Sequence, residues 1–211
     1  MGSAAERTEP SEFFAEVTVR VETHFRESAN LKLSSAQRLA APIAQAASLM
    51  VGSLRAGGKI LVCGNGGSAA DAQHFAAELV NRFEIDRPPL AAVALTTDSS
   101  ALTAIANDFR YEEVFAKQLR AIGRAGDVLL AISTSGNSTS VLKAVAMAQA
   151  LGVRVVGLTG GRGGVLGERL ADGDVHVTVP HTSTARVQEV HLLVLHCLCD
   201  AIDYQMFGAK S

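Results

Sequence analysis

The chain is poor in the features that mark a secreted, disulfide-stabilised protein. Its 211 residues include only 3 cysteines, Cys63, Cys197 and Cys199, and no CxxC motif. An odd set without such spacing argues against a disulfide framework or a cysteine-based metal site. A chain of this length can bury roughly 70% of its unfolded surface, so it needs no covalent cross-links. We therefore interpret all three cysteines as small buried residues in a reducing cytoplasm.

Long apolar runs and an excess of one charge are also missing. No segment reaches about 18 consecutive apolar residues, the length that a membrane-spanning helix needs. Residues 1–10 lack the basic start and apolar core of a signal peptide, and we expect them to form a disordered tail. The net charge of −2 argues against a strong general affinity for nucleic acid or anionic membranes. These absences favour a cytoplasmic protein that binds neither nucleic acid nor membrane.

The hydrophobic pattern predicts a single domain with a helical start and a longer alternating part. Apolar residues at helical spacing predict one helix over Glu12–Glu27 and a second from Ser34 or Ser35 to Arg55, so residues 11–57 form N-terminal helices. Over residues 58–207, short apolar segments alternate with helical ones, which is typical of a doubly wound α/β sandwich with a parallel sheet. The five expected strands are Lys59–Cys63, Ala91–Leu95, Asp127–Ile132, Arg154–Leu158 and Val175–Val179.

The last predicted helix, Thr184–Phe207, is apolar nearly all round from Val187 to Leu198. Such a helix needs burial on more than one side. Together with the N-terminal helices, it indicates a helical subunit interface.

The first candidate site lies where the first strand runs into a glycine-rich turn, Gly64–Ser68. Glycines let backbone N–H groups approach a ligand closely, and a helix N-terminus favours negative charge. The following helix carries His74 and Glu78, four residues apart and therefore on one face, where they can serve one metal ion or one substrate. Ser68 and Asp71 resemble a capping box that fixes the start of this helix. The alternative is a tight strand–helix turn with ordinary surface polar residues.

The second candidate is the polar turn Ser133–Ser138, directly after a buried strand and before a helix. Four hydroxyls, a glycine and an amide at a helix N-terminus suit a phosphomonoester held without a lysine. The alternative is a Ser/Thr-rich turn with ordinary helix caps. A weaker candidate is Asn107–Asp108, because loops after parallel strands bind ligands in α/β folds; there the alternative is a simple helix stop.

The last helix supplies further candidates, Gln188, Glu189, His191 and His196. A single helical histidine is more often a core or interface residue than a ligand, so these positions gain weight only beside His74 and Glu78. The other histidines, His24, His176 and His181, have no comparable setting, and we interpret them as structural.

The chain resembles the sugar isomerase (SIS) family. The segments GNGGSAADAQHFAAEL, LTAIANDFRYEEVFAKQLRA, GDVLLAISTSGNS and TARVQEVHLLVLHCLCDAID carry the resemblance, which extends from the second helix to about Phe207. It implies a three-layer α/β/α SIS sandwich with a five-stranded parallel sheet, plus N-terminal helices and a long C-terminal helix. It also implies a homotetramer with active sites at subunit interfaces.

Within that family, the chain is similar to the aldose–ketose isomerases of heptose phosphates. The resemblance implies conversion of sedoheptulose 7-phosphate to D-glycero-D-manno-heptose 7-phosphate through an enediol, the first step of bacterial ADP/GDP-heptose synthesis for lipopolysaccharide. It implies Glu78 and His196 as acid–base residues. It implies one Zn²⁺ per subunit, with these ligands: His74, Glu78, Gln188 and His196. The implied substrate contacts are Asn65, Gly66, Gly67, Ser68, Glu78, Asn107, Asp108, Ser133, Thr134, Ser135, Ser138 and Gln188.

Two questions remain at this point. Gln188 and His196 are separated by eight helical residues, or about 12 Å along the axis, which is awkward for one metal ion. A site completed by a neighbouring subunit is the easier arrangement.

The alternative function is a non-catalytic SIS adaptor of the replication-initiator-associating type, which the chain also resembles. Such adaptors lack the acid–base pair, whereas this chain keeps both Glu78 and His196.

Overall fold

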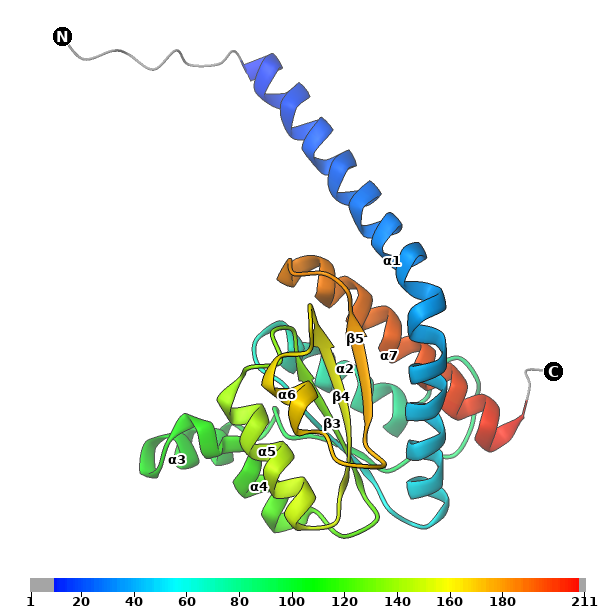
Figure 1. The fold of residues 1–211 in the computed structure, drawn as a ribbon, viewed down its shortest axis with the longest axis vertical. Coiled ribbons are helices and arrows are strands. Elements are labelled where there is room, and N and C mark those ends of the chain that lie inside the picture. The colour runs from blue at the N-terminus through cyan, green and yellow to red at the C-terminus, as the bar shows by residue number, and fades with distance from the viewer. Residues whose placement is uncertain (1–9, 209–211) are drawn as a thin grey trace.

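The computed structural model describes residues 10–208, so the expected disordered tail of residues 1–10 lies almost wholly outside the described part. The described chain forms a three-layer α/β/α sandwich preceded by one long helix (Figure 1). The strands are β1 (Ile60–Cys63), β2 (Ala92–Ala94), β3 (Val128–Ser133), β4 (Arg154–Gly160) and β5 (Val175–Val179). The α-helices are α1 (Pro10–Arg55), α2 (Gly67–Val80), α3 (Ser99–Asp108), α4 (Val114–Ile122), α5 (Thr139–Ala150), α6 (Gly164–Arg169) and α7 (Thr184–Phe207), with a 3₁₀ turn η1 (Tyr111–Glu113) before α4. The predicted fold class is confirmed.

The sheet is parallel throughout and has the strand order β2-β1-β3-β4-β5. Successive side chains of a strand point to opposite faces, so Ile60 and Val62 pack on one face while Leu61 and Cys63 pack on the other. Helices α1, α2 and α7 cover the first face, and α4, α5 and α6 cover the second. From β1 the chain continues to β2 on one side of it, and then crosses back to β3 on the other side of β1. The loops after β1 and β3 therefore flank the topological switch point, where open α/β sheets bind ligands.

The N-terminal region differs from the prediction of two helices. It is one continuous helix of 46 residues, α1. Residues 28–33 contain no glycine or proline that would stop it. Ser34, expected as an N-cap, instead donates its hydroxyl to the carbonyl of Leu31 in the preceding turn, at 3.1 Å. The first half of α1 projects away from the sandwich (Figure 1), and its second half packs on α7 and β5.

The cysteines differ from the prediction in one place. Cys63 and Cys199 are buried, but Cys197 is exposed on α7. Burial raises the pKa of the Cys63 thiol to about 12 and also raises that of Cys199, so both are protonated small core residues. In the described part of the chain, no helix combines the length and hydrophobicity needed to cross a membrane.

Candidate active site

The glycine-rich turn Gly64–Ser68, which follows β1, lies at the switch point of the sheet. Gly66 has φ 57°, a left-handed conformation that other residues avoid, and it is the N-cap of α2. A Cβ on Gly64 would lie 2.6 Å from the carbonyl oxygen of Ser68, so this tight turn needs glycine there as well. The expected capping box is wrong, because α2 has no side-chain cap. The N–H of Ser68 already bonds to the carbonyl of Asn65, at 3.0 Å.

Asn65 ties this turn to the second half of the sheet. Its amide donates to the hydroxyl of Ser140 at 2.9 Å, and its carbonyl oxygen accepts from the hydroxyl of Tyr111 at 2.8 Å. Ser140 belongs to the first turn of α5, directly after the second polar turn. Neither Ser140 nor Tyr111 was predicted. Ser140 continues the Ser/Thr pattern of that turn, whereas nothing in the sequence around Tyr111 links it to Asn65.

The Ser133–Ser138 turn is held closed by a contact between its first and last residues, and its role as an anion site remains a prediction. The hydroxyl of Ser133 donates to that of Ser138 at 3.2 Å, and Ser138 is the N-cap of α5. Gly136 has φ 68°, and a Cβ there would overlap the backbone of Gly163, so this position also requires glycine. Asn137 has a structural role instead, because its side-chain oxygen accepts from the N–H of Val165 at 3.0 Å.

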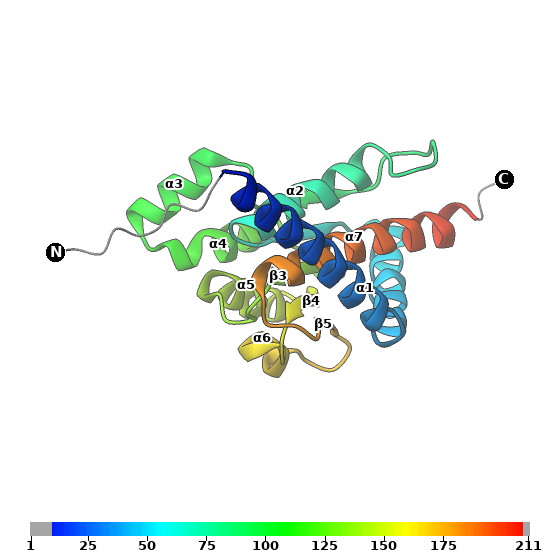
Figure 2. The same ribbon diagram turned by 90° about the horizontal axis from the view of Figure 1, so that it is seen from above.

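Helices α2 and α7 pack side by side and run in the same direction (Figure 2). At their starts, the amide of Gln188 packs so closely on Gly67 that a Cβ on that glycine would overlap it. Two turns further along, Nε2 of His196 lies 3.3 Å from Nε2 of His74. The same atom of His74 lies 3.1 Å from Oε1 of Glu78, one turn further along α2. The structure thus brings three of the four predicted metal ligands into one chain of contacts.

These contacts fit zinc in donor type, because two imidazoles and a carboxylate are ordinary zinc ligands. Two ligands of a tetrahedral zinc ion stand about 3.3–3.5 Å apart, close to the His74–His196 spacing. Over residues 10–208, however, no group of three or more His, Cys, Asp or Glu side chains is arranged to hold a metal ion. His74 sits between the other two, and Gln188 lies at Gly67, about 10 Å of helix rise before His74.

Asp71 is a neighbour of this group that the sequence suggested only as a capping residue. Burial raises the pKa of its carboxyl to about 6, against a smaller lowering by the charge of His74. Its Oδ2 is buried and has no hydrogen-bond partner among the described residues. A buried polar group without a partner is costly, which makes Asp71 a further candidate for a ligand contact beside His74.

Asn107 and Asp108 are predicted substrate contacts that lie on another element, α3. They end α3, which has no fully buried residue and lies at the outer edge of the molecule (Figure 1). Both side chains are exposed, and the amide of Asn107 donates to the carboxylate of Asp108 at 2.9 Å. Their role remains a prediction.

His191 and Glu189 do not join the contacts around His74. His191 is fully buried, and its Nε2 bonds to the carbonyl of Thr159 at 3.0 Å. Burial lowers its pKa to about 4, with a smaller raising effect of that hydrogen bond. Glu189 pairs with Arg186 at 2.9 Å. As predicted for a structural residue, His176 sits in the sheet, where Thr159 and Thr178 contact its Nε2 at 2.8 and 2.7 Å.

Fold and site together define a class: an α/β/α sandwich with two polar turns at the switch point of the sheet and an acid–imidazole group beside them. The family model of the SIS domain matches residues 24–160, and the chain belongs to that family.

Individual relatives narrow this class. The chain is 62% identical to the phosphoheptose isomerase of Aromatoleum aromaticum over 192 residues, which is 91% of this chain and 97% of that protein. It superposes on the solved phosphoheptose isomerase of Neisseria gonorrhoeae with a TM-score of 0.85 and 54% identity, covering 89% of this chain and 98% of the other. The Francisella tularensis phosphoheptose isomerase gives a TM-score of 0.86 and 45% identity over the same shares. The chain is therefore an aldose–ketose isomerase, and none of these relatives favours the adaptor.

Proposed function

We propose that the chain converts sedoheptulose 7-phosphate to D-glycero-D-manno-heptose 7-phosphate in the cytoplasm, as the first step of bacterial ADP/GDP-heptose synthesis. The observation that carries this proposal is the direct contact of His74 with both Glu78 and His196. Glu78 and His196 are the acid–base pair that the resemblance implies for an isomerase and that the adaptor type lacks. The names of the relatives, at 54–62% identity, support the heptose phosphate as substrate.

Glu78 is the proposed base. It removes a proton from the carbon next to the substrate carbonyl, which leaves an enediol, and it returns the proton to the neighbouring carbon. Its side chain is about one quarter exposed, so a substrate can reach it, and His74 holds it from the preceding turn. His196 is the proposed group that moves the hydroxyl protons during ring opening and enediol formation.

Zinc is part of the proposal. His74, Glu78 and His196 would hold one ion per subunit, and Gln188 would complete the set. Zinc there would supply polarisation of the substrate carbonyl. Because Gln188 lies at Gly67, it can serve the metal only by swinging along α2 or by coming from another subunit. In its observed place it supports the proposed substrate contact beside Asn65, Gly66 and Gly67, and the phosphate would lie in the Ser133–Ser138 turn.

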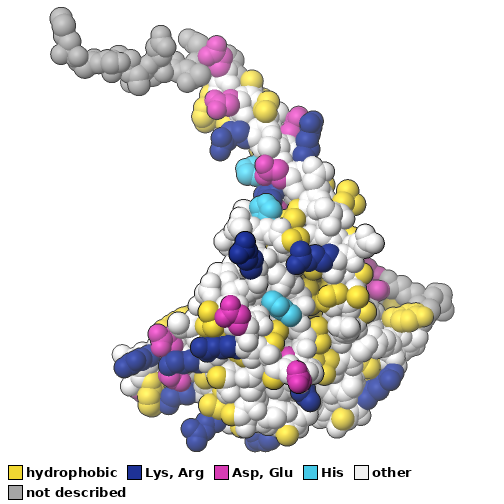
Figure 3. Space-filling view, viewed as in Figure 1, with side chains coloured by type: hydrophobic (Ala, Val, Ile, Leu, Met, Phe, Trp, Pro, Cys, Tyr) yellow, Lys and Arg dark blue, Asp and Glu magenta, His cyan; other side chains and the backbone are white. Residues whose placement is uncertain are grey.

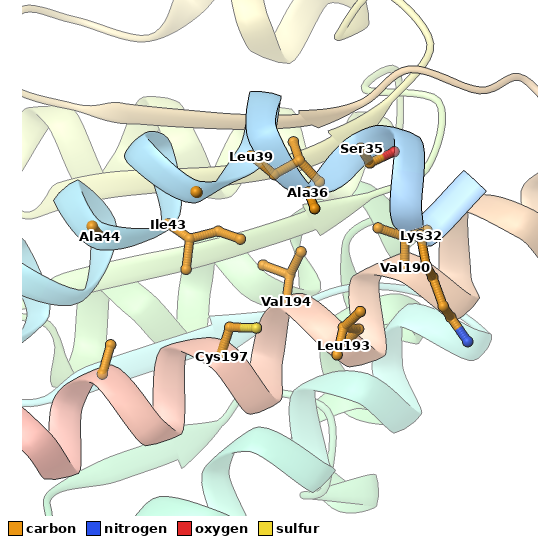
Figure 4. A pocket seen from close by; sticks show the side chains of 12 residues that line it. Lys32, Ser35, Ala36, Leu39, Ile43, Ala44, Val190, Leu193, Val194 and Cys197 are labelled. Atoms are coloured by element: carbon orange, nitrogen blue, oxygen red, sulfur yellow. The ribbon is translucent and has the colours of Figure 1, made fainter. Parts of the chain in front are cut away.

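We further propose the homotetramer with active sites at subunit interfaces. The projecting half of α1 exposes large apolar side chains, including Phe14 at 73% and Phe25 at 75% (Figure 3). Where α1 meets α7, an apolar groove of about 350 Å³ opens between Leu39 and Ile43 on one side and Val194 and Cys197 on the other (Figure 4). Apolar surface of this extent calls for a partner. Phe14→Ser with Phe25→Ser should dissociate the assembly, measured by analytical ultracentrifugation, whereas an unchanged mass would contradict this role of α1.

The test of the function is incubation of purified protein with sedoheptulose 7-phosphate, with chelator, with chelator and then zinc, and untreated. Chromatography separates the aldoheptose 7-phosphate from the ketose. We expect conversion that chelator removes and zinc restores. Conversion that survives chelation would show that the reaction does not need the metal. If no conversion occurs under any condition, the assignment of sedoheptulose 7-phosphate as the substrate is wrong.

A further inference from the structure

A buried arginine outside the contacts described so far links the two helices of the site. Arg87 lies in the loop between α2 and β2, and its side chain is 1% exposed. Its guanidinium donates to the carbonyl of Glu78 at 2.9 Å and to that of Leu79 at 2.8 Å, the last turn of α2. A cation placed there satisfies carbonyls that have no partner within the helix and complements the helix dipole. Arg87 thus holds the backbone of the proposed base itself.

The other end of the link is Asp203 on α7. Its Oδ1 accepts from Nε of Arg87 at 2.7 Å, and its side chain is 7% exposed. Asp203 follows His196 by seven residues, about two turns, so both point from the same face of α7 toward α2. The second oxygen, Oδ2, is buried and has no hydrogen-bond partner among the described residues. Asp203 therefore bonds to Arg87 through one carboxylate oxygen only, rather than through the two parallel hydrogen bonds of a bidentate pair.

Buried ion pairs seldom add net stability, because desolvation of both charges offsets their attraction. A role in geometry explains the pair better. Two hydrogen-bonded contacts join α2 and α7 beyond the packing of Gln188 on Gly67: His74 with His196, and the last turn of α2 with Asp203 through Arg87. Because Arg87 bonds to both the carbonyl of Glu78 and Asp203, this contact would set the distance between Glu78 on α2 and His196 on α7.

We propose that Arg87 and Asp203 are positioning residues for the isomerisation, which hold Glu78 and His196 in register across the α2–α7 pair. The catalytic part of this proposal rests on the proposed function, since it gives Glu78 and His196 their roles. Neither residue belongs to the polar turns assigned to the sugar phosphate. Loss of the pair should therefore lower kcat and leave KM nearly unchanged.

Two variants separate the parts of the link. Arg87→Lys keeps the positive charge, but a single ammonium cannot contact Asp203 and both carbonyls in the arginine geometry. We expect kcat to fall about 100-fold, the scale of a misplacement near 1 Å in an active site, with KM within about 2-fold. Asp203→Asn keeps an acceptor for Nε of Arg87, so its fall in kcat should be smaller.

The control is another ionic contact with a buried carboxylate, Asp127 with Lys59, at the opposite end of the strands from the polar turns. Asp127, at the N-terminal edge of β3, accepts from Lys59 Nζ at 2.7 Å and from two backbone N–H groups, and it is 2% exposed. Asp127→Asn should lower the melting temperature as the other variants do, yet leave kcat unchanged. A fall in kcat that follows the melting temperature in all three variants would mean that the Arg87–Asp203 pair is merely structural.

A readout without substrate keeps this proposal separate from the proposed function. Hydrogen exchange, followed by mass spectrometry, should be at least 10-fold faster in the last turn of α2 in Arg87→Lys than in the wild type, and unchanged there in Asp127→Asn. If the wild type fails to convert sedoheptulose 7-phosphate, the substrate assignment fails, and kcat is then compared on whichever ketose phosphate of a panel it isomerises. Unchanged exchange in Arg87→Lys, or a wild-type kcat in that variant, would overturn the positioning role.

Discussion

His191 and His196 are five residues apart on the same helix, yet their surroundings are opposite. His196 belongs to the proposed active-site group with His74 and Glu78, which is partly open to solvent and joined by contacts of 3.1 and 3.3 Å. His191 belongs to a core group with Thr159, His176 and Thr178, linked to hydroxyls and a backbone carbonyl. The two surroundings differ in what they would allow: the proposed active-site group has a carboxylate and is open to a substrate, whereas His191 is fully buried and bonds to a backbone carbonyl.

The largest expected effect falls on the proposed active-site group. Glu78→Gln keeps the size of the side chain but removes the proposed base, so turnover should fall by about 10²–10⁴-fold, the contribution of a general base. The fold should be unchanged, as measured by circular dichroism. Glu168→Gln, at an exposed carboxylate of α6, is the control and should keep wild-type turnover. Near-normal turnover in Glu78→Gln would refute the base assignment.

The core group should instead affect how the free energy of unfolding changes with pH. The folded-state pKa of His191, about 4, lies below the ordinary value of 6.5. Above pH 6.5, both folded and unfolded states hold a neutral imidazole, so nothing is lost. As the pH falls from 6.5 toward 4, only the unfolded state gains the proton, and stability falls. Between pH 7.5 and 5 this one group should cost about 2 kcal/mol.

The measurement is urea unfolding of the wild type and His191→Gln at both pH values. The raised pKa of Asp71 acts in the opposite direction in both proteins and cancels in the comparison. The wild type should lose about 2 kcal/mol more than the variant over this range. Equal losses of unfolding free energy in the two proteins would show that His191 can be protonated in the folded state at no cost. The buried surroundings of His191 would then not differ in effect from those of His196.

The smallest effect concerns a hydroxyl of the core group. Thr178→Val removes a hydrogen bond of 2.7 Å to Nε2 of His176 and keeps the shape of the side chain. His176 still has Thr159 as partner, so the loss should be about 1 kcal/mol of unfolding free energy, with unchanged turnover. A loss of turnover beyond 2-fold would place the core group in the mechanism after all.

Sequence reasoning found the elements and failed where a choice depends on three-dimensional surroundings. The last helix was predicted at Thr184–Phe207 and is found there, because its long apolar stretch contains no glycine or proline that would stop a helix. It broke α1 between Glu27 and Ser34, since Ser34 and Ser35 suit a cap as well as a helix interior. It took Asp71 for a capping residue, because local spacing says nothing of which side chains face inward. The contact of Asn65 with Tyr111 joins segments 46 residues apart and has no local signal.

The central claim is that Glu78 carries a proton between two neighbouring carbons of a ketoheptose 7-phosphate. Incubating sedoheptulose 7-phosphate with the enzyme in deuterated water, followed by NMR, tests it most directly. A carboxylate that exchanges with solvent should place deuterium at carbon 2 of the aldoheptose product, and Glu78→Gln should abolish both conversion and incorporation. Conversion by Glu78→Gln with undiminished deuterium incorporation would contradict the account.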